Sequence, residues 1–343
     1  MTNQTTQTTP AMQQYYDIKK EYNDSIIFFR MWDFYEMFWI DAEIAHKVLW
    51  INVTSRNKNA VNPEKLAGFP YHAKDKYLPM LISAWYKVAI VEQVSDPTLK
   101  WIVKREVVRV VTPATISLEW ESYENVTDSN IIISITKQTH KFGLSYINIS
   151  TNKWESAEFI SFEDLAKNLY KISPLEVVLD KKLFNDENIK NILEKKYSLN
   201  IYYYEFREDA YKKLTTHFKT KNLTWFWLEE KTEAIFASAL LLSYLELNQK
   251  QSLSNLSSMW VMSFWDYLEL DDSTLKNLDI IYNFATQSHT AGTLFWLLNK
   301  TKTSMWKRLL RENLLKPLKD KAKIDERLCF VQEFFNDKIL LDK

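Results

Sequence analysis

The stretch Ser25–Glu36, SIIFFRMWDFYE, joins two elements that organise the first part of the chain. Its first seven residues, Ser25–Met31, are mostly apolar and predict a buried strand. Apolar residues then recur with helical spacing over Phe34–Leu49 and predict a helix. Asp33 would cap this helix, and Glu36, three residues later, would complete a capping box with Asp in the Ser/Thr role.

Helices and strands alternate around this stretch and predict a compact mixed α/β domain over residues 1–118. The further elements expected in this domain are a helix that begins at Pro10, strands at Ile51–Ser55, Lys87–Val94 and Glu106–Val111, and a helix at about Ala73–Ala84.

A second domain is predicted over residues 119–228, entered through the acidic and polar segment Glu119–Asp128. Three antiparallel strands are expected first, and helices and strands then alternate; the strands are Ile131–Lys137, Phe142–Ser150 and Trp154–Ile160, followed by helix Phe162–Tyr170, strand Glu176–Leu179, helix Glu187–Glu194, strand Asn200–Tyr204 and helix Glu208–His217. This order is typical of an RNase H-like sheet with helices on its faces. Residues 229–343 are almost wholly helical in pattern, so the predicted fold class is α/β multidomain with an all-α last segment.

Composition excludes several classes of protein. Lys and Arg balance Asp and Glu at 44 each, so the net charge does not indicate a nucleic-acid, membrane or acidic partner. One cysteine excludes an internal disulfide and fits a reducing cytoplasm. The first ten residues are polar, and the longest apolar stretch, Ala234–Leu245, is too short to span a bilayer, which predicts a soluble cytoplasmic protein.

The chain has thirteen tryptophans but only three glycines. Average usage would give on the order of two dozen glycines in a chain of this length. Several tryptophans lie where a chain needs a residue without a side chain, among them Trp32, Trp50 and the pair Trp225 and Trp227. We interpret many or all of them as UGA codons that the source organism reads as glycine; the alternative is a protein unusually rich in tryptophan.

The run Phe28–Glu36, FFRMWDFYE, resembles the mismatch-recognition motif of the bacterial MutS family of DNA mismatch repair proteins, with Trp32 in place of the family's glycine. Other segments agree in order along the whole chain: Ala67–His72 (AGFPYH), Tyr86–Gln93 (YKVAIVEQ), Lys104–Pro113 (KREVVRVVTP), Leu270–Leu278 (LDDSTLKNL) and Thr303–Leu310 (TSMWKRLL). The family also commonly has glycine at the positions of Trp85, Trp101, Trp227 and Trp306, which independently supports the codon interpretation.

The resemblance implies three parts: a mismatch-binding domain at 1–118, a connector at 119–228 that contacts the repair partner MutL, and the beginning of a helical lever domain at 229–343. The family's clamp, its ATPase with ATP and Mg²⁺, and its dimerisation region would lie beyond Lys343, so this chain is expected to hold no cofactor and to dimerise only as part of a longer protein. The apolar stripe of Ile324, Leu328, Val331 and Phe335 has no obvious partner in the sequence and fits this expectation, although packing on earlier helices would also cover it.

Phe34 would be the family's wedge, stacking on a mispaired base from the minor groove, and Glu36 would hydrogen-bond that base. Periodicity alone favours another interpretation, in which Glu36 closes the helix cap and Phe34 joins Met37 and Phe38 on an apolar helix face. Two stretches of basic residues surround the motif, and we rank four of their members as phosphate contacts: Arg56, Lys58, Lys74 and Arg109. Tyr71 and His72 are interpreted as structural turn residues, and no histidine or cysteine spacing suggests a metal site.

The sequence argues against two classes of enzyme, a two-metal nuclease and an ATPase with a phosphate-binding loop. A two-metal nuclease needs carboxylates, but the first two predicted connector strands contain no Asp or Glu. A phosphate-binding loop fails even with every Trp written as Gly, since the spacing from Trp260 to Trp265 is followed by Asp266 and Tyr267. The remaining alternative to DNA recognition is a non-catalytic interaction module that docks repair partners through the connector.

Overall fold

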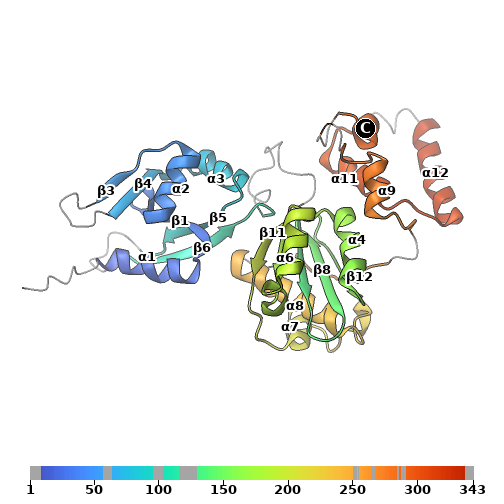
Figure 1. Cartoon of the computed structure of the whole chain (residues 1–343), viewed down its shortest axis with the longest axis horizontal. Helices are drawn as coiled ribbons and strands as arrows, with labels where there is room; N and C mark the ends of the chain where they lie inside the picture. The colour runs from blue at the N-terminus through green and yellow to red at the C-terminus, as the bar shows by residue number, and fades with distance from the viewer. Residues whose placement is uncertain are drawn as a thin grey trace, which may run out of the picture.

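The computed structural model describes residues 9–56, 64–95, 103–115, 130–249, 253, 255–263, 267–283, 286 and 291–336. They form two six-stranded sheets with helices on their faces and a helical last segment, which lie side by side along the longest axis (Figure 1). The predicted class, α/β multidomain with an all-α end, is confirmed.

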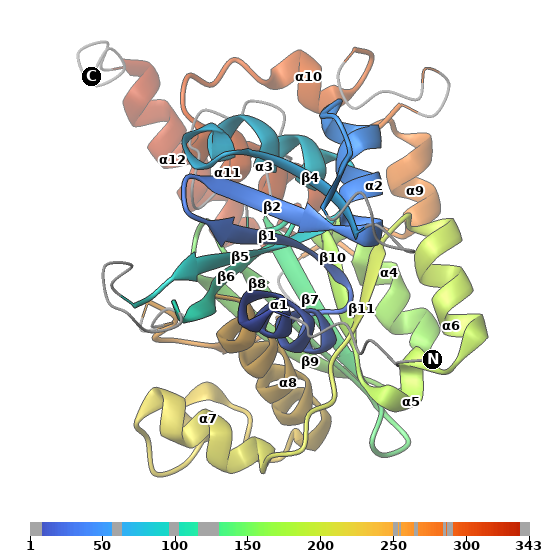
Figure 2. The same ribbon diagram turned by 90° about the vertical axis from the view of Figure 1, so that its left-hand side faces the viewer.

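The first sheet has the strand order β3-β4-β2-β1-β5-β6. Its strands are β1 (Ser25–Met31), β2 (Phe34–Phe38), β3 (Thr54–Arg56), β4 (Glu64–Pro70), β5 (Lys87–Gln93) and β6 (Arg105–Val111). Helices α2 (Trp39–Leu49) and α3 (Lys74–Ser83) cover one face, and α1 (Pro10–Glu21) covers the other (Figure 2). Each face therefore has its own apolar core.

The helix predicted from Phe34 is wrong in its first turn, because Phe34–Phe38 is strand β2 and α2 begins at Trp39. Tyr35 and Met37 point into the core beneath α2 and α3, as period-two alternation requires. The strand pairs with β1 on one side and with β4 on the other. The capping box of Asp33 and Glu36 is wrong for the same reason.

The second sheet has the order β11-β10-β7-β8-β9-β12, in which β7, β8 and β9 are antiparallel and β10 and β11 run parallel to β7. Its strands are β7 (Ile131–Thr136), β8 (Phe142–Asn148), β9 (Lys153–Phe159), β10 (Glu176–Leu179), β11 (Asn200–Tyr203) and β12 (Trp260–Val261). The predicted succession of three antiparallel strands and alternating elements is confirmed.

Helices cover both faces of this second sheet. The helices are α4 (Phe162–Ile172), α5 (Lys181–Phe184) and α6 (Glu187–Asn191) on one face, and α7 (Ala210–Phe218) and α8 (Thr232–Gln249) on the other. Fourteen of the eighteen residues of α8 are buried, since the helix packs on β7, β8 and β9. Helix α8 belongs by sequence to residues 229–343, the segment predicted to be almost wholly helical, but it completes the core of the second sheet. The same segment also contributes strand β12 to that sheet.

The first and second sheets are joined by polar contacts around Lys87. Its ammonium group lies 2.8 Å from the Asp24 carboxylate and 3.5 Å from the ring centroid of Tyr202, which belongs to β11. Glu176 on β10 accepts a hydrogen bond of 2.8 Å from the backbone N–H of Ala114, just beyond β6, and burial raises the pKa of this carboxyl. These contacts hold the first sheet against the second.

The last segment contains α9 (Asp272–Asn277), α10 (Leu294–Leu298), α11 (Ser304–Leu315) and α12 (Lys321–Asn336). No side chain of α12 is buried against the other residues that the structure describes. Its apolar stripe is exposed, including Leu328, Val331 and Phe335, so packing on earlier helices does not cover it.

Five tryptophans have a positive φ: 56° at Trp32, 49° at Trp39, 59° at Trp50, 65° at Trp85 and 58° at Trp227. Trp50 is the left-handed C-cap of α2, and Trp227 ends a short 3₁₀ helix in the same conformation. Glycine adopts this region without steric cost, whereas for a bulky side chain it is a rare outlier. These backbone angles support the interpretation of the five residues as native glycines.

Trp154 is different, because its indole is a buried part of the core of the second sheet. It is fully buried on β9, its Nε1 donates a hydrogen bond of 2.8 Å to Ser145 Oγ, and its ring packs 5.4 Å from the ring of Phe218. Glycine at this position would leave a large cavity. The structure therefore favours glycine at five of the thirteen positions and tryptophan at Trp154.

We expect glycine at Trp32, Trp227 and Trp306 in the protein made by its native host, and tryptophan at Trp154. Trp32 and Trp227 have the backbone angles of glycine. The resemblance of the sequence to the family implies glycine at all three positions. Peptide mass spectrometry of the native protein checks this, because each replacement changes the mass of one peptide. Tryptophan at all three positions would contradict the codon interpretation.

Candidate functional site

The Phe28–Glu36 motif, FFRMWDFYE, forms a tight hairpin between β1 and β2. Met31 pairs with Phe34, which leaves Trp32 and Asp33 as a two-residue turn. The positive φ of Trp32 places it where such turns favour glycine. The backbone N–H of Tyr71, just after β4, donates a hydrogen bond of 2.9 Å to the Asp33 carbonyl. This bond anchors the turn to the end of β4.

Phe34 and Glu36 lie on the same face of β2, since residues two apart on a strand point to the same side. Phe34 adjoins the turn and 47% of its surface is exposed. Glu36 pairs with Phe29 on β1 and with Gly68 on β4. The structure thus presents an exposed aromatic ring with a carboxylate beside it on a paired, central strand.

Gly68 keeps the backbone beside Glu36 open. A Cβ atom at Gly68 would lie 2.9 Å from the Tyr35 carbonyl oxygen and 3.6 Å from Glu36 Cγ. The first distance is too short for real Cβ contacts, so any larger residue would shift β2 or β4. This requirement explains why one of the few glycines in the chain stands in the AGFPYH segment.

The opposite face of the hairpin is held by a network around Arg30. Its guanidinium stacks 3.8 Å from the centroid of the Tyr71 ring, and its Nε donates to the Trp32 carbonyl at 2.5 Å. The Tyr35 hydroxyl donates to the Glu92 carboxylate, and burial together with this bond raises the pKa of Tyr35. Arg30 also lies 3.5 Å from the Glu92 carboxylate. The hairpin is therefore a rigid support for the residues on its other face.

Arg105 of β6 is the charged neighbour of Glu36. It is only 7% exposed, its Nε donates to the Arg30 carbonyl at 2.7 Å, and its guanidinium lies 5.3 Å from the centroid of Phe29. Burial lowers the pKa of Arg105, and the Glu36 carboxylate acts in the opposite direction. The negative charge of Glu36 is thus partly balanced from within the protein, a relationship between distant residues that no motif in the sequence indicates.

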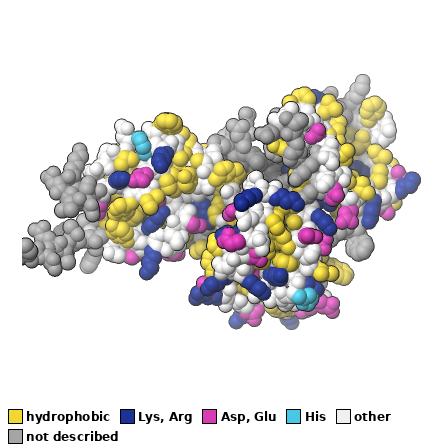
Figure 3. All heavy atoms as spheres, in the orientation of Figure 1, with side chains coloured by type: hydrophobic (Ala, Val, Ile, Leu, Met, Phe, Trp, Pro, Cys, Tyr) yellow, Lys and Arg dark blue, Asp and Glu magenta, His cyan; other side chains and the backbone are white. Residues whose placement is uncertain are grey.

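The structure describes the side chains of two of the four predicted phosphate contacts, Lys74 and Arg109. Arg56 is the last residue of β3, and nothing is described of its side chain; Lys58 lies outside the described residues. Lys74 is the half-buried first residue of α3, and Arg109 donates a hydrogen bond of 3.3 Å to the Thr115 carbonyl. Basic and acidic side chains are interspersed over the molecular face in Figure 3. The four assignments stay predictions.

Neither a metal centre nor a membrane helix is found in what the structure describes. Within these ranges, His, Cys, Asp and Glu side chains form no group of three or more that could hold a metal ion. Among the described helices, none combines the length and apolar character needed to cross a membrane.

Comparison with known proteins gives three family models that match in order along the chain. MutS domain I matches residues 9–119, MutS domain II residues 130–257 and MutS domain III residues 273–343. The first match contains the hairpin with Phe34 and Glu36, the second contains the whole of α8, and the third begins at the second residue of α9 and contains α10 to α12.

Curated relatives agree with these matches. The DNA mismatch repair protein MutS of Halothermothrix orenii is 38% identical over 342 residues, which cover 98% of this chain and 38% of that protein. The protein of the same name from Acetivibrio thermocellus is 36% identical over 336 residues, covering 95% and 38%. The DNA mismatch repair protein HexA of Streptococcus pneumoniae is 37% identical over 329 residues, covering 96% and 37%. The chain thus spans well under half of the length of these relatives.

Proposed function

This chain belongs to the MutS family, whose domains I, II and III it carries in order, and we propose that it recognises mispaired or looped-out bases in duplex DNA for mismatch repair. The observation that carries the proposal is the arrangement of Phe34 and Glu36 on one face of a braced hairpin. The named role of the relatives in mismatch repair supports it.

Phe34 has the geometry of a wedge. An apolar ring inserted from the minor groove partly unstacks a base step and kinks the duplex, at a cost of about a few kcal/mol. A mispaired base has already lost part of its pairing and stacking, so the same insertion costs less there. A wedge on a rigid support thereby converts the deformability of the DNA into selectivity.

Glu36 has a different task in this proposal. Its carboxylate would meet the edge of the base on which Phe34 stacks, because the two side chains lie on the same strand face. A carboxylate near phosphates is unfavourable on any duplex, but a hydrogen bond to an exposed base edge offsets this cost at a mispair. Arg105 reduces the cost of holding Glu36 ionised before DNA binds.

The test of the function is the binding of labelled duplexes that differ by one mispair. We expect tighter binding of the mispaired duplex by this chain, or by a chimera in which it replaces the matching segment of a MutS relative. The rival function, a module that only docks protein partners through the second sheet, predicts no DNA binding by the chain and no mismatch preference in the chimera.

We also propose that a MutL-like partner docks on the connector, the part of the chain that contains the second sheet, and that dimerisation requires regions of the family beyond domain III.

We expect the chain alone to hydrolyse no ATP and to cut no nucleic acid. The first two strands of the second sheet, β7 and β8, carry no Asp or Glu, and the sequence has no phosphate-binding loop. Phosphate release and the integrity of a labelled duplex, both measured with added Mg²⁺, check this. Metal-dependent turnover that disappears when a residue of this chain is changed would contradict the prediction.

A further inference from the structure

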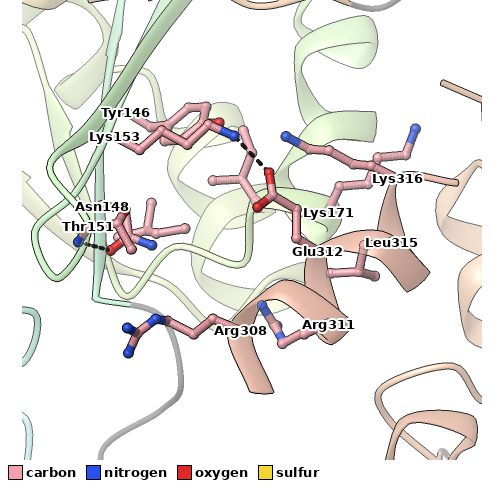
Figure 4. Close-up of a pocket in the computed structure, with 12 residues that line it drawn as sticks. Tyr146, Asn148, Thr151, Lys153, Lys171, Arg308, Arg311, Glu312, Leu315 and Lys316 are labelled. Carbon is pink, nitrogen blue, oxygen red and sulfur yellow. Dashed lines mark hydrogen bonds and ion pairs between the residues drawn. The ribbon is translucent and has the colours of Figure 1, made fainter. Parts of the chain in front are cut away.

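The cavity between the second sheet and helix α11 is bridged by ion pairs within the protein. In Figure 4 a dashed line joins Lys153 of β9 to Glu312 of α11, and the charged atoms of the two lie 2.7 Å apart. Glu155 lies 3.3 Å from Lys153 and 4.0 Å from Lys316. These charges balance one another and need no bound ion.

The ring of Tyr71 is an exposed group that the packing of the protein does not explain. It lies beside the hairpin turn, is 44% exposed and belongs to neither apolar core of the first sheet. The turn role expected for Tyr71 accounts for its backbone bond to Asp33 but not for this ring. We propose that Tyr71 contacts the sugar–phosphate wall of the minor groove, and does so only where a mispair lets the groove open. This inference rests on the function proposed above.

Tyr71 and the wedge belong to opposite faces of the hairpin. Phe34 and Glu36 share one face of β2, whereas Tyr35 points the other way, into the core beneath α2 and α3. Arg30 pairs with Tyr35 in the ladder, and its guanidinium lies 5.6 Å from the centroid of the Tyr35 ring and 3.8 Å from that of Tyr71. The hairpin thus carries one exposed aromatic ring on each face near its turn.

The wedge and Tyr71 are also close along the strands. Phe34 pairs with Pro70 of β4, and Tyr71 is the next residue. The Tyr71 N–H is bonded to the carbonyl of Asp33, which directly precedes Phe34. A duplex that receives the ring of Phe34 therefore also comes within reach of Tyr71.

Arg30 holds the Tyr71 ring in one orientation. The Arg30 side chain is 18% exposed, its Nε donates to the Trp32 carbonyl, and it lies 3.5 Å from the Glu92 carboxylate. Attraction between the guanidinium and the electron-rich ring face adds to this restraint. A ring that is already held in place loses little conformational freedom on binding, which favours its use as a contact.

The thickness of the hairpin makes the Tyr71 contact depend on the width of the groove. A strand layer with side chains on both faces occupies about 10 Å, the spacing of packed sheets, whereas the minor groove of B-DNA is about 6 Å wide. A perfect duplex therefore admits at most one face of the hairpin. Insertion of an apolar wedge kinks the duplex toward the major groove and opens the minor groove. Phe34 and Tyr71 contact DNA together only in the opened groove, which makes Tyr71 selective for a mispair.

Binding of labelled duplexes by Tyr71 variants tests the contact. Tyr71→Ala should weaken binding of the mispaired duplex about tenfold, a moderate loss for an interface aromatic, and leave binding of the perfect duplex unchanged. Tyr71→Phe keeps the ring and should bind as the parent does. Tyr16→Ala is the matched control, because Tyr16 is 41% exposed and stacks on Trp39, at the end of β2 away from the turn. Thermal melts check that each variant is folded.

Combination with Phe34→Ala tests whether the contact depends on the opened groove. The wedge opens the groove, so Tyr71→Ala should cause no further loss of affinity in the Phe34→Ala background. Additive losses would overturn the proposal, because Tyr71 would then contact DNA without the wedge. Photocrosslinking from benzoylphenylalanine at position 71 needs no truncated side chain. It should label the mispaired duplex and not the perfect one when both are saturated with protein.

The outcomes separate this inference from the proposed function. If the parent prefers the mispaired duplex and Phe34→Ala abolishes the preference, but Tyr71→Ala changes neither affinity, Tyr71 is no contact and the wedge function stands. An equal loss for both duplexes in Tyr71→Ala would also overturn the inference, since the contact would not depend on groove width. A parent without any mismatch preference would overturn the proposed function and the Tyr71 contact together.

Discussion

Replacing Trp32, Trp39, Trp50, Trp85 and Trp227 by glycine is expected to raise the free energy of unfolding by about 4 kcal/mol. A left-handed backbone costs an L-residue roughly 1–2 kcal/mol in the folded state, and glycine removes this cost. Glycine also stabilises the unfolded chain through its larger conformational entropy, by about 0.5–1 kcal/mol. The net gain in folding stability is therefore about 1 kcal/mol at each exposed site. All five have a positive φ, and none is fully buried. Four of the indoles are exposed, so little packing is lost with them, whereas Trp39 packs on the rings of Tyr15, Tyr16 and Phe38 and should contribute no net gain.

Four of these five positions lie in the unit of the first sheet, so the effect should concentrate there. A gain of about 3 kcal/mol in a domain of this size raises its Tm by roughly 12–24 °C. Thermal melts followed by calorimetry measure the shift, and separate transitions for the two sheets would show where the gain lies. No change in the melting of the first unit would contradict a strained backbone at these tryptophans.

Trp225 and Trp227 form a matched pair of controls. Their side chains are 81% and 77% exposed, but only Trp227 has a positive φ. Trp227→Gly should stabilise the chain, whereas Trp225→Gly should be neutral or slightly destabilising. Trp154→Gly should destabilise by at least about 3–5 kcal/mol, the usual cost of truncating a buried aromatic to alanine. Equal effects in the pair would show that φ is not the cause.

Phe34→Ala should lower the affinity for a mispaired duplex about tenfold to a hundredfold, to the value for a perfect duplex. Stacking of an aromatic ring on a base contributes about 1–3 kcal/mol, and phosphate contacts preserve a salt-dependent background affinity. Phe34 is about half exposed and adjoins a turn, so the variant should stay folded. Fluorescence anisotropy with the two duplexes, in the chimera and in the chain alone, measures the ratio.

Tyr203→Ala, on β11 of the second sheet, is a control for the loss of an exposed aromatic outside the sheet that contains the hairpin, and it should keep the mismatch preference. If Phe34→Ala also keeps the preference, Phe34 is not a wedge.

Removing the Glu36 carboxylate should reduce the mismatch preference in a different way from Phe34→Ala, by raising the affinity for the perfect duplex. Glu36→Ala removes a carboxylate that repels phosphates, so affinity for the perfect duplex should rise while affinity for the mispaired duplex changes less. Glu36 lies on a strand, so no helix cap is lost, but buried Arg105 loses a balancing charge and some stability should fall with it. Glu36→Gln keeps the size of the side chain and separates charge from shape. An unchanged affinity ratio in both variants would rule out a role for Glu36 in discrimination.

The sequence by itself determined the order of the parts, the family and most strands. β1 and β7 were predictable because each is a nearly continuous apolar run, and β8 and β9 because turn residues separate short alternating segments. The long motifs in their shared order indicated the family before any geometry was known. The excess of tryptophan over glycine indicated native glycines, but not which indoles are needed.

Only the tertiary structure decided the conformation of the site. Phe34, Met37 and Phe38 fit a helical period and Tyr35 and Met37 a strand period, so local pattern left β2 ambiguous. Pairing with β1 and with β4, about thirty residues later, selected the strand and placed Phe34 and Glu36 on one face.

The same reason explains the other features that the sequence left undecided. The charge of Glu36 acts on Arg105 although 69 residues separate them, since β2 and β6 belong to one sheet in which only β1 and β5 lie between them. Trp154 is fully buried, whereas Trp227 is exposed and has a positive φ, and these two properties distinguish a needed indole from a position that favours glycine. Contacts between distant segments carry no signature in any short window of sequence, because they depend on which strands pair and which faces become buried.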